Sequence, residues 1–360
     1  MNRELETGKF RNYLSETEKN TKVRRYLDYP KFFSLINTNS LYFARPTEFD
    51  DPLDSLLPKF HGVNNSSGYI LLNQQFAKQN AKLYLNSIIS KVNETYGQNP
   101  TRDQLFIVFQ HFLIPLALNG CFIDSTDLIK EIMDSIWEII DSYIANEREL
   151  SISILAKLIL DVGSRSMVNT QEMNKKRALV NCWHMDNESE LMWHKYSNNA
   201  GIAIETTANQ LESLDFKKYI ENNCTCIISK VEYINLEEKH KIANEKSMGE
   251  KTEYKNLNNY YFEKSKCFSA ENELRLVILE STENILLDYK KNKKFPEKGE
   301  LVKINTPIEK FIEKIIISPN SPDYYKDTLY ETLINLKKPE LAGKINVSDI
   351  QSEQENILKL

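Results

Sequence analysis

Two charged residues in an apolar segment are the first candidates for chemistry. Residues 273–279 have the sequence ELRLVIL, and this alternation predicts a strand with Glu273 and Arg275 on one face. Glu271 precedes them at the same parity. A solvent-exposed ladder of salt bridges is one interpretation of these residues. The other places the charges at a rim or pairs them in a cavity, because the strand around them is apolar.

An aromatic segment supplies the second set of candidates. Residues 181–205 have the sequence NCWHMDNESELMWHKYSNNAGIAIE, which predicts a short helix followed by a strand. Met192 and Tyr196 share one face of that helix, with Trp193 beside them. Because so short a helix is rarely stable alone, its aromatic face must pack on other elements. It forms either a Trp-rich corner of the core or a pocket wall where Trp193, Tyr196 and His194 hold a flat ligand.

The cysteines indicate neither a disulfide framework nor a nucleophile. The chain has five of them, widely spaced, and no signal peptide is recognised, so a reducing cytoplasm is the expected compartment. Cys224 and Cys226 have C-x-C spacing with no second pair, which favours free thiols over a zinc site. Cys182 and His184 would point the same way along a strand without an orienting acid, so they do not make a catalytic triad.

Three acidic residues follow a predicted strand at residues 41–43. Asp50, Asp51 and Asp54 lie in a loop that Pro52 restrains. Together they could bind a cation. We favour the interpretation that they are turn residues, whose carboxylates satisfy their own backbone. No metal site is therefore predicted.

The composition limits the class of protein. The chain has 360 residues, of which 41% are hydrophobic and 27% charged, and this is typical of a soluble protein with a substantial core. The formal net charge of −5 argues against a general duplex-binding surface, which would need a concentrated basic face. The most apolar run, residues 105–118, is shorter than the ~20 residues of a membrane span and predicts a buried helix.

The pattern of apolar residues divides the chain into segments. Residues 68–177 have helical spacing almost throughout, whereas strand patterns lie on both sides of them. We therefore predict an α+β fold, with a compact sheet core interrupted by a large helical insertion. The predicted parts are a polar N-terminal arm (1–22), the α+β domain (23–67 and 178–336), the helical insertion (68–177) and a C-terminal tail (337–360).

Several short motifs, taken in this order, resemble the bacterial DUF2971 family. The resemblance covers residues 23–60 and 178–335 and leaves out the helical segment. In two positions the chain departs from the family pattern: Asp50 stands where Asn is usual, and Asp54 stands where Glu is frequent. The motifs are Leu41-Tyr42-Phe43, Phe49-Asp50-Asp51-Pro52, Cys182-Trp183, Glu188-Ser189, Met192-Trp193 with Tyr196, Gly201-Ile202-Ala203-Ile204, Lys230-Val231-x-Tyr233, Lys264 or Lys266 with Phe268 before Glu271-x-Glu273-x-Arg275, and Ile316-Ile317-Ser318-Pro319.

The layout of this family is similar to that of ADP-ribosyltransferase-like folds, with a mixed or antiparallel sheet core. The similarity would make Glu273 the catalytic glutamate and Tyr196 the ring that stacks on nicotinamide. Tyr26 would be a contact on the first strand, and Arg45 would lie near the pyrophosphate of NAD. One carboxylate in a dry cleft is physically sufficient to stabilise the positive charge of the transition state. The chain has no G-x-G-x-x-G fingerprint for a dinucleotide.

These features support three hypotheses about the function of the protein. The first is a cytoplasmic NAD-consuming enzyme of a bacterial anti-phage or toxin system, which transfers ADP-ribose or hydrolyses NAD. The second is a non-catalytic module that senses a nucleotide-like small molecule or a phage protein. In that module Arg25, Arg45 and Arg275 would grip an anion, and the helical insertion would bind a protein partner. The third is a metal-dependent hydrolase that uses the acidic loop with Glu271 and Glu273.

Overall fold

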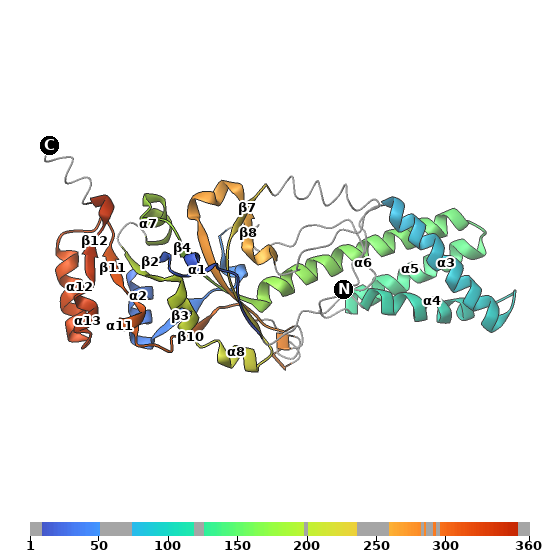
Figure 1. The fold of residues 1–360 in the computed structure, drawn as a ribbon. Coiled ribbons are helices and arrows are strands. Elements are labelled where there is room, and N and C mark those ends of the chain that lie inside the picture. Colours follow the sequence, from blue (N-terminus) through green and yellow to red (C-terminus); the bar gives the residue numbers. More distant parts are fainter. Residues whose placement is uncertain are drawn as a thin grey trace. The chain divides into compact units, whose positions relative to one another are not determined.

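The computed structural model describes most of the chain in two compact units. The first unit comprises Met1–Leu56, Lys175–Ile234 and Asn258–Leu360, and the second comprises Leu57–Asn174 and Asn235–Leu257. The described residues are 9–50, 74–118, 126–197, 201–235, 259–281, 284–285, 291–292 and 296–351. The first unit contains both strands and helices, whereas the described elements of the second are helices (Figure 1). The fold is therefore α+β, as predicted.

In the described residues of the first unit, eight strands form one mixed sheet. Their order is β1-β6-β9-β4-β2-β5-β11-β12, so strands from both ends of the chain flank those from its middle. The strands are β1 (Phe10–Asn12), β2 (Lys22–Leu27), β4 (Ala178–His184), β5 (Ile202–Thr207), β6 (Thr225–Lys230), β9 (Glu273–Leu279), β11 (Lys314–Ile317) and β12 (Ile345–Val347). Two smaller pairs accompany the sheet, β3 (Ser40–Phe43) with β10 (Glu300–Lys303) and β7 (Glu232–Ile234) with β8 (Glu263–Ser265).

The central strands are covered on both faces. Every residue of β9 is buried, and β4 is buried except for a half-exposed Cys182. Strands buried on both faces carry nearly continuous apolar runs, as ALVNCWH and ELRLVIL do. Charged residues inside β9 therefore need partners within the protein.

Short helices cover the sheet. In α2 the side chain of Asp28 accepts the backbone N–H of Lys31 at 2.8 Å, Pro30 occupies the first turn, and Asn39 ends the helix with a φ of 49°. These residues are typical helix start and stop signals. The helices of this unit are α1 (Glu16–Lys19), α2 (Tyr29–Thr38), α7 (Glu190–Ser197), α8 (Lys217–Glu221), α11 (Ile308–Phe311), α12 (Tyr324–Asn335) and α13 (Pro339–Ala342), with 3-10 turns η1 (Pro46–Glu48), η2 (Ala208–Ser213), η3 (Asn259–Phe262) and η4 (Lys266–Glu271).

The second unit has its own hydrophobic core. It contains α3 (Gln74–Tyr96), α4 (Arg102–Leu118), α5 (Thr126–Ile144) and most of α6 (Arg148–Arg177). Ile88 of α3, Phe109 of α4, Ile136 of α5 and Leu155 of α6 are fully buried against one another. In the part of the chain that the structure describes, no helix is long and apolar enough to cross a membrane.

Both ends of the chain correct the sequence-based expectation. The segment predicted as a polar arm supplies β1, which pairs in parallel with β6, and α1, which Ser15 caps. The segment predicted as a tail supplies β12, which pairs in parallel with β11. Strands of three residues at the edge of a sheet are too short to show a period of two, so the sequence pattern did not reveal them.

Candidate functional site

Three neighbouring strands bring charged side chains to one face of the sheet. Arg24 on β2 is the Cα partner of His184 on β4, and His184 is the partner of Glu273 on β9. Cys182 is likewise the partner of Arg275. Directly opposed residues of antiparallel strands point to the same face. The register therefore places these five residues in two adjacent rows.

The strands β2 and β4 diverge beyond the row formed by Arg24, His184 and Glu273. In the described residues they pair at one position, Arg24 with His184, whereas β2 pairs with β5 from Lys22 to Leu27. The guanidinium of Arg25 bridges the divergence, because Nη1 donates to the carbonyl of Cys182 at 3.3 Å and Nη2 donates to the carbonyl of Tyr42 at 3.1 Å. The side chain of Arg25 thus connects β2 to β4 and β3 where the backbones of β2 and β4 do not pair.

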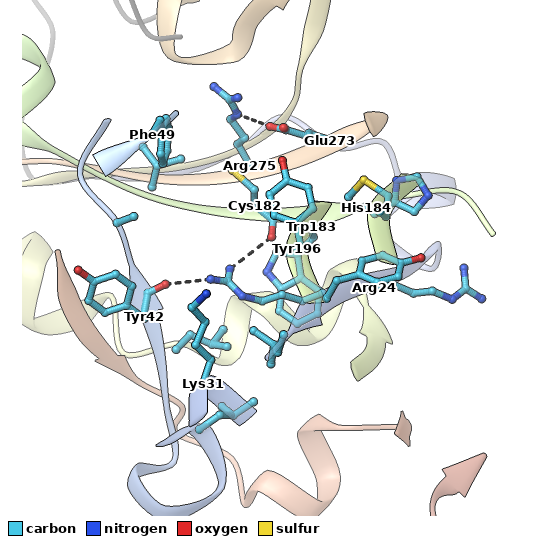
Figure 2. A pocket seen from close by; sticks show the side chains of 18 of the residues that line it. Arg24, Lys31, Tyr42, Phe49, Cys182, Trp183, His184, Tyr196, Glu273 and Arg275 are labelled. Atoms are coloured by element: carbon cyan, nitrogen blue, oxygen red, sulfur yellow. Dashed lines mark hydrogen bonds and ion pairs between the residues drawn. The ribbon is translucent and has the colours of Figure 1, made fainter. Parts of the chain in front are cut away.

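A pocket of about 760 Å³ opens at this divergence. Figure 2 shows Tyr42 and Phe49 on one side of it and Cys182, Tyr196 and Arg275 on the other. Its size is that of an ordinary small-molecule site. The pocket lining includes Arg24, Arg25, Tyr26, Lys31, Tyr42, Phe49, Cys182, His184, Lys195, Tyr196, Lys264, Glu273 and Arg275.

Four of the seven residues predicted for the site line this pocket. They are Tyr26, Tyr196, Glu273 and Arg275. The structure thus places the proposed catalytic glutamate and the proposed stacking ring at one cavity, although they lie on different elements.

Arg45 does not line the pocket. Its side chain is 1% exposed, and its guanidinium donates to the carbonyl of Lys298 at 2.9 Å, to the carboxylate of Glu280 at 3.0 Å and to the carbonyl of Lys176. These contacts fasten the end of β3 to the start of β4 and the end of β9. Arg45 is therefore a structural residue, which corrects its predicted place beside a pyrophosphate.

Trp193 and His194 are also outside the lining residues. Trp193 is fully buried and packs edge-on against Tyr26, with ring centroids 4.8 Å apart. Its indole N–H donates to Glu188 at 3.2 Å. His194 is exposed on α7. The helix turns Lys195 and Tyr196 to the pocket instead, and Trp193 supports Tyr26 from behind.

The charges on β9 form a buried network. The Oε1 atom of Glu273 accepts from Lys264 at 2.9 Å, and its Oε2 atom accepts from Nε of Arg275 at 2.6 Å. Lys264 also donates to Glu271 at 2.6 Å, as does Lys195 at 2.5 Å. The side chain of Glu273 is 4% exposed. These residues are therefore paired beside a cavity, and the alternative of an exposed salt-bridge ladder is wrong.

The network separates the acidities of the two glutamates. Burial, followed by a hydrogen bond shared with Glu273, raises the pKa of Glu271. Burial opposes ionisation of Glu273 as well, but the charge of Arg275, the bond to Glu271 and the charge of Lys264 together hold its pKa below the ordinary value. Burial and then the charges of Glu271 and Glu273 raise the pKa of Tyr196. Near pH 7 Glu273 is thus an anion and Tyr196 a neutral phenol.

The histidine at the site and the two buried thiols on or beside β6 are not arranged as a nucleophile and its base. The ring nitrogens of His184 lie 2.7 Å from the carbonyl oxygen of Glu271 and 3.0 Å from that of Asn187. Both are thus engaged by the backbone. Cys224 and Cys226 are buried, and burial raises the pKa of the first to about 11 and of the second to about 12. Neither is a reactive thiolate at neutral pH.

The acidic loop is described up to Asp50, which lines the pocket. Asp51 and Asp54 lie outside the described residues. Among the residues that are described, no group of three or more His, Cys, Asp or Glu side chains is arranged to hold a metal ion. Glu271 and Glu273 are bound by lysine and arginine cations, so their oxygens are not directed at a shared metal position.

None of the three pocket lysines, Lys31, Lys195 and Lys264, was predicted as a site residue. Lys195 follows Trp193 and His194 in a helix too short for its faces to be assigned from periodicity. Lys264 lies on β8, a strand of three residues. Its spacing from Glu271 and Glu273 was visible, but their contact depends on how η4 turns the chain back. Only the position of Lys264 within a family motif gave any signal.

The fold and the site define an α+β protein with a charged, aromatic pocket at the divergence of two sheet strands. A model of the family described as "Protein of unknown function (DUF2971)" matches residues 192–276, so this part of the chain is similar to that family. The matched segment runs from α7 into β9 and carries Lys195, Tyr196, Lys264 and Glu273. The comparisons with curated proteins and with solved structures found no match. The similarity to ADP-ribosyltransferases stays a prediction.

Proposed function

We propose that the pocket of the first unit binds a nucleotide-like small molecule and that the protein is a nucleotide-sensing module. The observation that carries this proposal is the presence of exposed aromatic rings among charged side chains in one cavity. Tyr42 is 38% exposed and Tyr196 is 36% exposed, and both line the pocket with Phe49. Exposed aromatic faces are the usual platforms for a nucleobase.

The charged lining suits the other part of a nucleotide. Six Lys and Arg residues and three Asp and Glu residues line the pocket. A ligand with a flat ring and an anionic group can use both kinds of contact. An apolar ligand would offer no polar contact to these charges.

Protection of Cys182 from alkylation tests binding directly. Cys182 is half-exposed and lines the pocket, Cys267 is exposed elsewhere, and Cys224 and Cys226 are buried. A bound nucleotide should slow the labelling of Cys182 by iodoacetamide and leave that of Cys267 unchanged, as measured by peptide mass spectrometry. A panel of nucleotides that neither protects Cys182 nor raises the melting temperature would overturn the proposal.

A second candidate, an NAD-consuming enzyme, is favoured by one observation. Glu273, whose pKa is lowered, and Tyr196 line the same pocket, so an anion and an aromatic ring are available to a bound nicotinamide ribose. Both oxygens of Glu273 pair with Lys264 and Arg275, and this pairing weakens its ability to stabilise a positive charge. For this reason the binding function stands first.

Nicotinamide release separates the two candidates. The purified protein is incubated with NAD, alone and with varied acceptors, and is compared with Glu273→Gln. Protection of Cys182 by NAD without nicotinamide release supports the sensor. Release by the wild type that Glu273→Gln abolishes supports the enzyme, and equal release by both variants would remove Glu273 from the mechanism.

The wider setting is part of the same proposal. A nucleotide sensor or an NAD-consuming enzyme finds its ligand in the cytoplasm, and we propose a role in bacterial anti-phage defence or a toxin system. The second unit would then bind a protein partner. It exposes Leu83 on α3 and Ile107 on α4, apolar residues of a kind often found at interfaces.

A further inference from the structure

Arg25 differs from every other cation that lines the pocket. Each of the other five has a carboxylate within ion-pair distance. In the part of the chain that the structure describes, Arg25 has none. The five pairs are Arg24 with Glu205 at 2.6 Å, Lys31 with Asp28 at 2.9 Å, Lys195 with Glu271 at 2.5 Å, Lys264 with Glu271 and Glu273, and Arg275 with Glu273 at 2.6 Å.

The guanidinium of Arg25 is held in place by backbone carbonyls. Two of its N–H groups donate to Cys182 and Tyr42. A guanidinium has five N–H groups, so three are left for a ligand. Because the two carbonyls belong to different strands, they fix the plane of the group at the divergence of β2 and β4. A fixed fork loses little freedom when it binds an anion.

The surroundings of Arg25 leave its charge uncompensated. The residue is half-buried, and burial lowers its pKa to about 10. Glu48 and Asp50 also line the pocket, but both are exposed, and Glu48 accepts from the hydroxyl of Tyr42 at 2.6 Å and from the backbone N–H of Gly299 at 2.7 Å. A half-buried cation without a counter-charge carries a desolvation cost, and an anionic ligand relieves that cost.

Arg25 and Lys31 together present more hydrogen-bond donors than the two oxygens of a carboxylate can accept. Lys31 lines the same pocket, and Figure 2 shows it with Tyr42 toward one end, away from the pair of Glu273 and Arg275. The ammonium of Lys31 can add donors to the three N–H groups of Arg25. A phosphate monoester presents three terminal oxygens and carries about −1.5 to −2 charges at pH 7. It therefore satisfies more of these donors than a carboxylate does.

We infer that the ligand is a nucleoside phosphate, that Arg25 binds its phosphate at the divergence of β2 and β4, and that the base lies toward Tyr196. This inference rests on the proposed nucleotide-binding function of the same pocket. It adds a chemical class, a contact residue and an orientation. The ring of Tyr42 stands beside the phosphate, and Glu273 faces the nucleoside end.

The test compares four nucleosides with their 5′-monophosphates by isothermal titration calorimetry. For the wild type, at least one monophosphate should bind about tenfold or more tightly than its nucleoside, as expected of a charge-assisted contact. In Arg25→Gln that ratio should fall to about one, while the affinity for the nucleoside stays within about twofold. Lys22→Gln is the control, because Lys22 lies on the same strand outside the pocket lining and pairs with Glu313. Lys22→Gln should keep the wild-type ratio of monophosphate affinity to nucleoside affinity.

Arg25→Lys guards against a folding defect in Arg25→Gln. It keeps a cation in place but has three N–H donors instead of five, so it should retain part of the ratio. The inference would be overturned if Arg25→Gln kept the wild-type ratio of monophosphate affinity to nucleoside affinity. If Arg25→Gln does not fold, the same result in Arg25→Lys would overturn it. Either result would leave the proposed nucleotide binding intact. A wild type that binds neither nucleosides nor monophosphates would overturn the proposed function and the inference with it.

Discussion

The hydroxyl of Ser348 donates a hydrogen bond to the carboxylate of Glu188, a residue 160 positions earlier in the chain. The other oxygen of Glu188 accepts the backbone N–H of Asp349 at 2.9 Å, and the indole N–H of Trp193 donates to the same carboxylate. Ile350 packs beside Tyr26 and Trp193. The segment after β12 therefore braces the helix that carries Lys195 and Tyr196.

Glu188→Ala should loosen α7 and lower stability. The substitution leaves three donors without their charged acceptor, and we expect a loss of about 1–3 kcal/mol in the free energy of unfolding. Urea denaturation measures this loss, and hydrogen exchange should show faster opening of α7 than of β9. Glu190→Ala is the control, since Glu190 is exposed in the first turn of α7. Equal effects of the two substitutions would show that Glu188 is not a brace.

Gly299 lies where a side chain has no room. A Cβ atom there would be 1.9 Å from the carbonyl oxygen of Phe43 and 2.8 Å from Cα of Ala44. Gly299→Ala must therefore push β3 away from the segment before β10, with a loss of roughly 2 kcal/mol or more. Gly343→Ala is the matched control, because the nearest atom to its Cβ would be 3.6 Å away. A melting temperature for Gly299→Ala as high as that of Gly343→Ala would contradict this close approach.

The central elements of the fold were visible in the sequence because their patterns are local. The alternation in β9 and the apolar spacing of α3 to α6 each depend on residues within a few positions of one another. The edge strands β1 and β12 were not visible. Each has three residues, and what holds them is hydrogen bonding to a distant strand.

At the site, too, the features that depend on neighbouring residues could be predicted, and those that depend on distant residues could not. Glu273, Arg275 and Tyr196, which line the pocket, could be singled out because a charge in an apolar strand and an aromatic helix are conspicuous. The error at Arg45 has a physical reason: an arginine after a strand serves a ligand or a backbone equally well, and its partners lie near residues 176, 280 and 298. The divergence of β2 and β4 depends on register across the sheet, which no single segment encodes.

At acidic pH the free energy of unfolding should depend on the ionisation of Glu273. Its pKa is lowered from the ordinary 4.5, so its pairing with Arg275 and Lys264 contributes stability above pH 4.5 that is lost as the pH falls through the lowered value. Glu273→Gln should cost about 3–5 kcal/mol near neutral pH, because it leaves buried cations short of a carboxylate. The difference from the wild type should narrow below pH 4.5.

Urea denaturation between pH 7 and pH 3 measures that difference. Glu16→Gln, on the exposed face of α1, is the control and should change the free energy of unfolding little at any pH, since its pair with Lys19 lies at the surface. A difference between wild type and Glu273→Gln that stays constant over this range would contradict the pairing.

Tyr196 should contribute to ligand binding through its ring more than through its hydroxyl. Tyr196→Phe keeps the aromatic face, whereas Tyr196→Ala removes it, and stacking of a base on a ring is worth about 1–3 kcal/mol. The alanine variant should therefore bind the best nucleotide roughly five- to 150-fold more weakly, and the phenylalanine variant should stay close to the wild type. Tyr324→Ala controls for loss of an exposed tyrosine outside the pocket, on α12. Equal affinities for Tyr196→Ala and Tyr324→Ala by isothermal titration calorimetry would place the base away from α7.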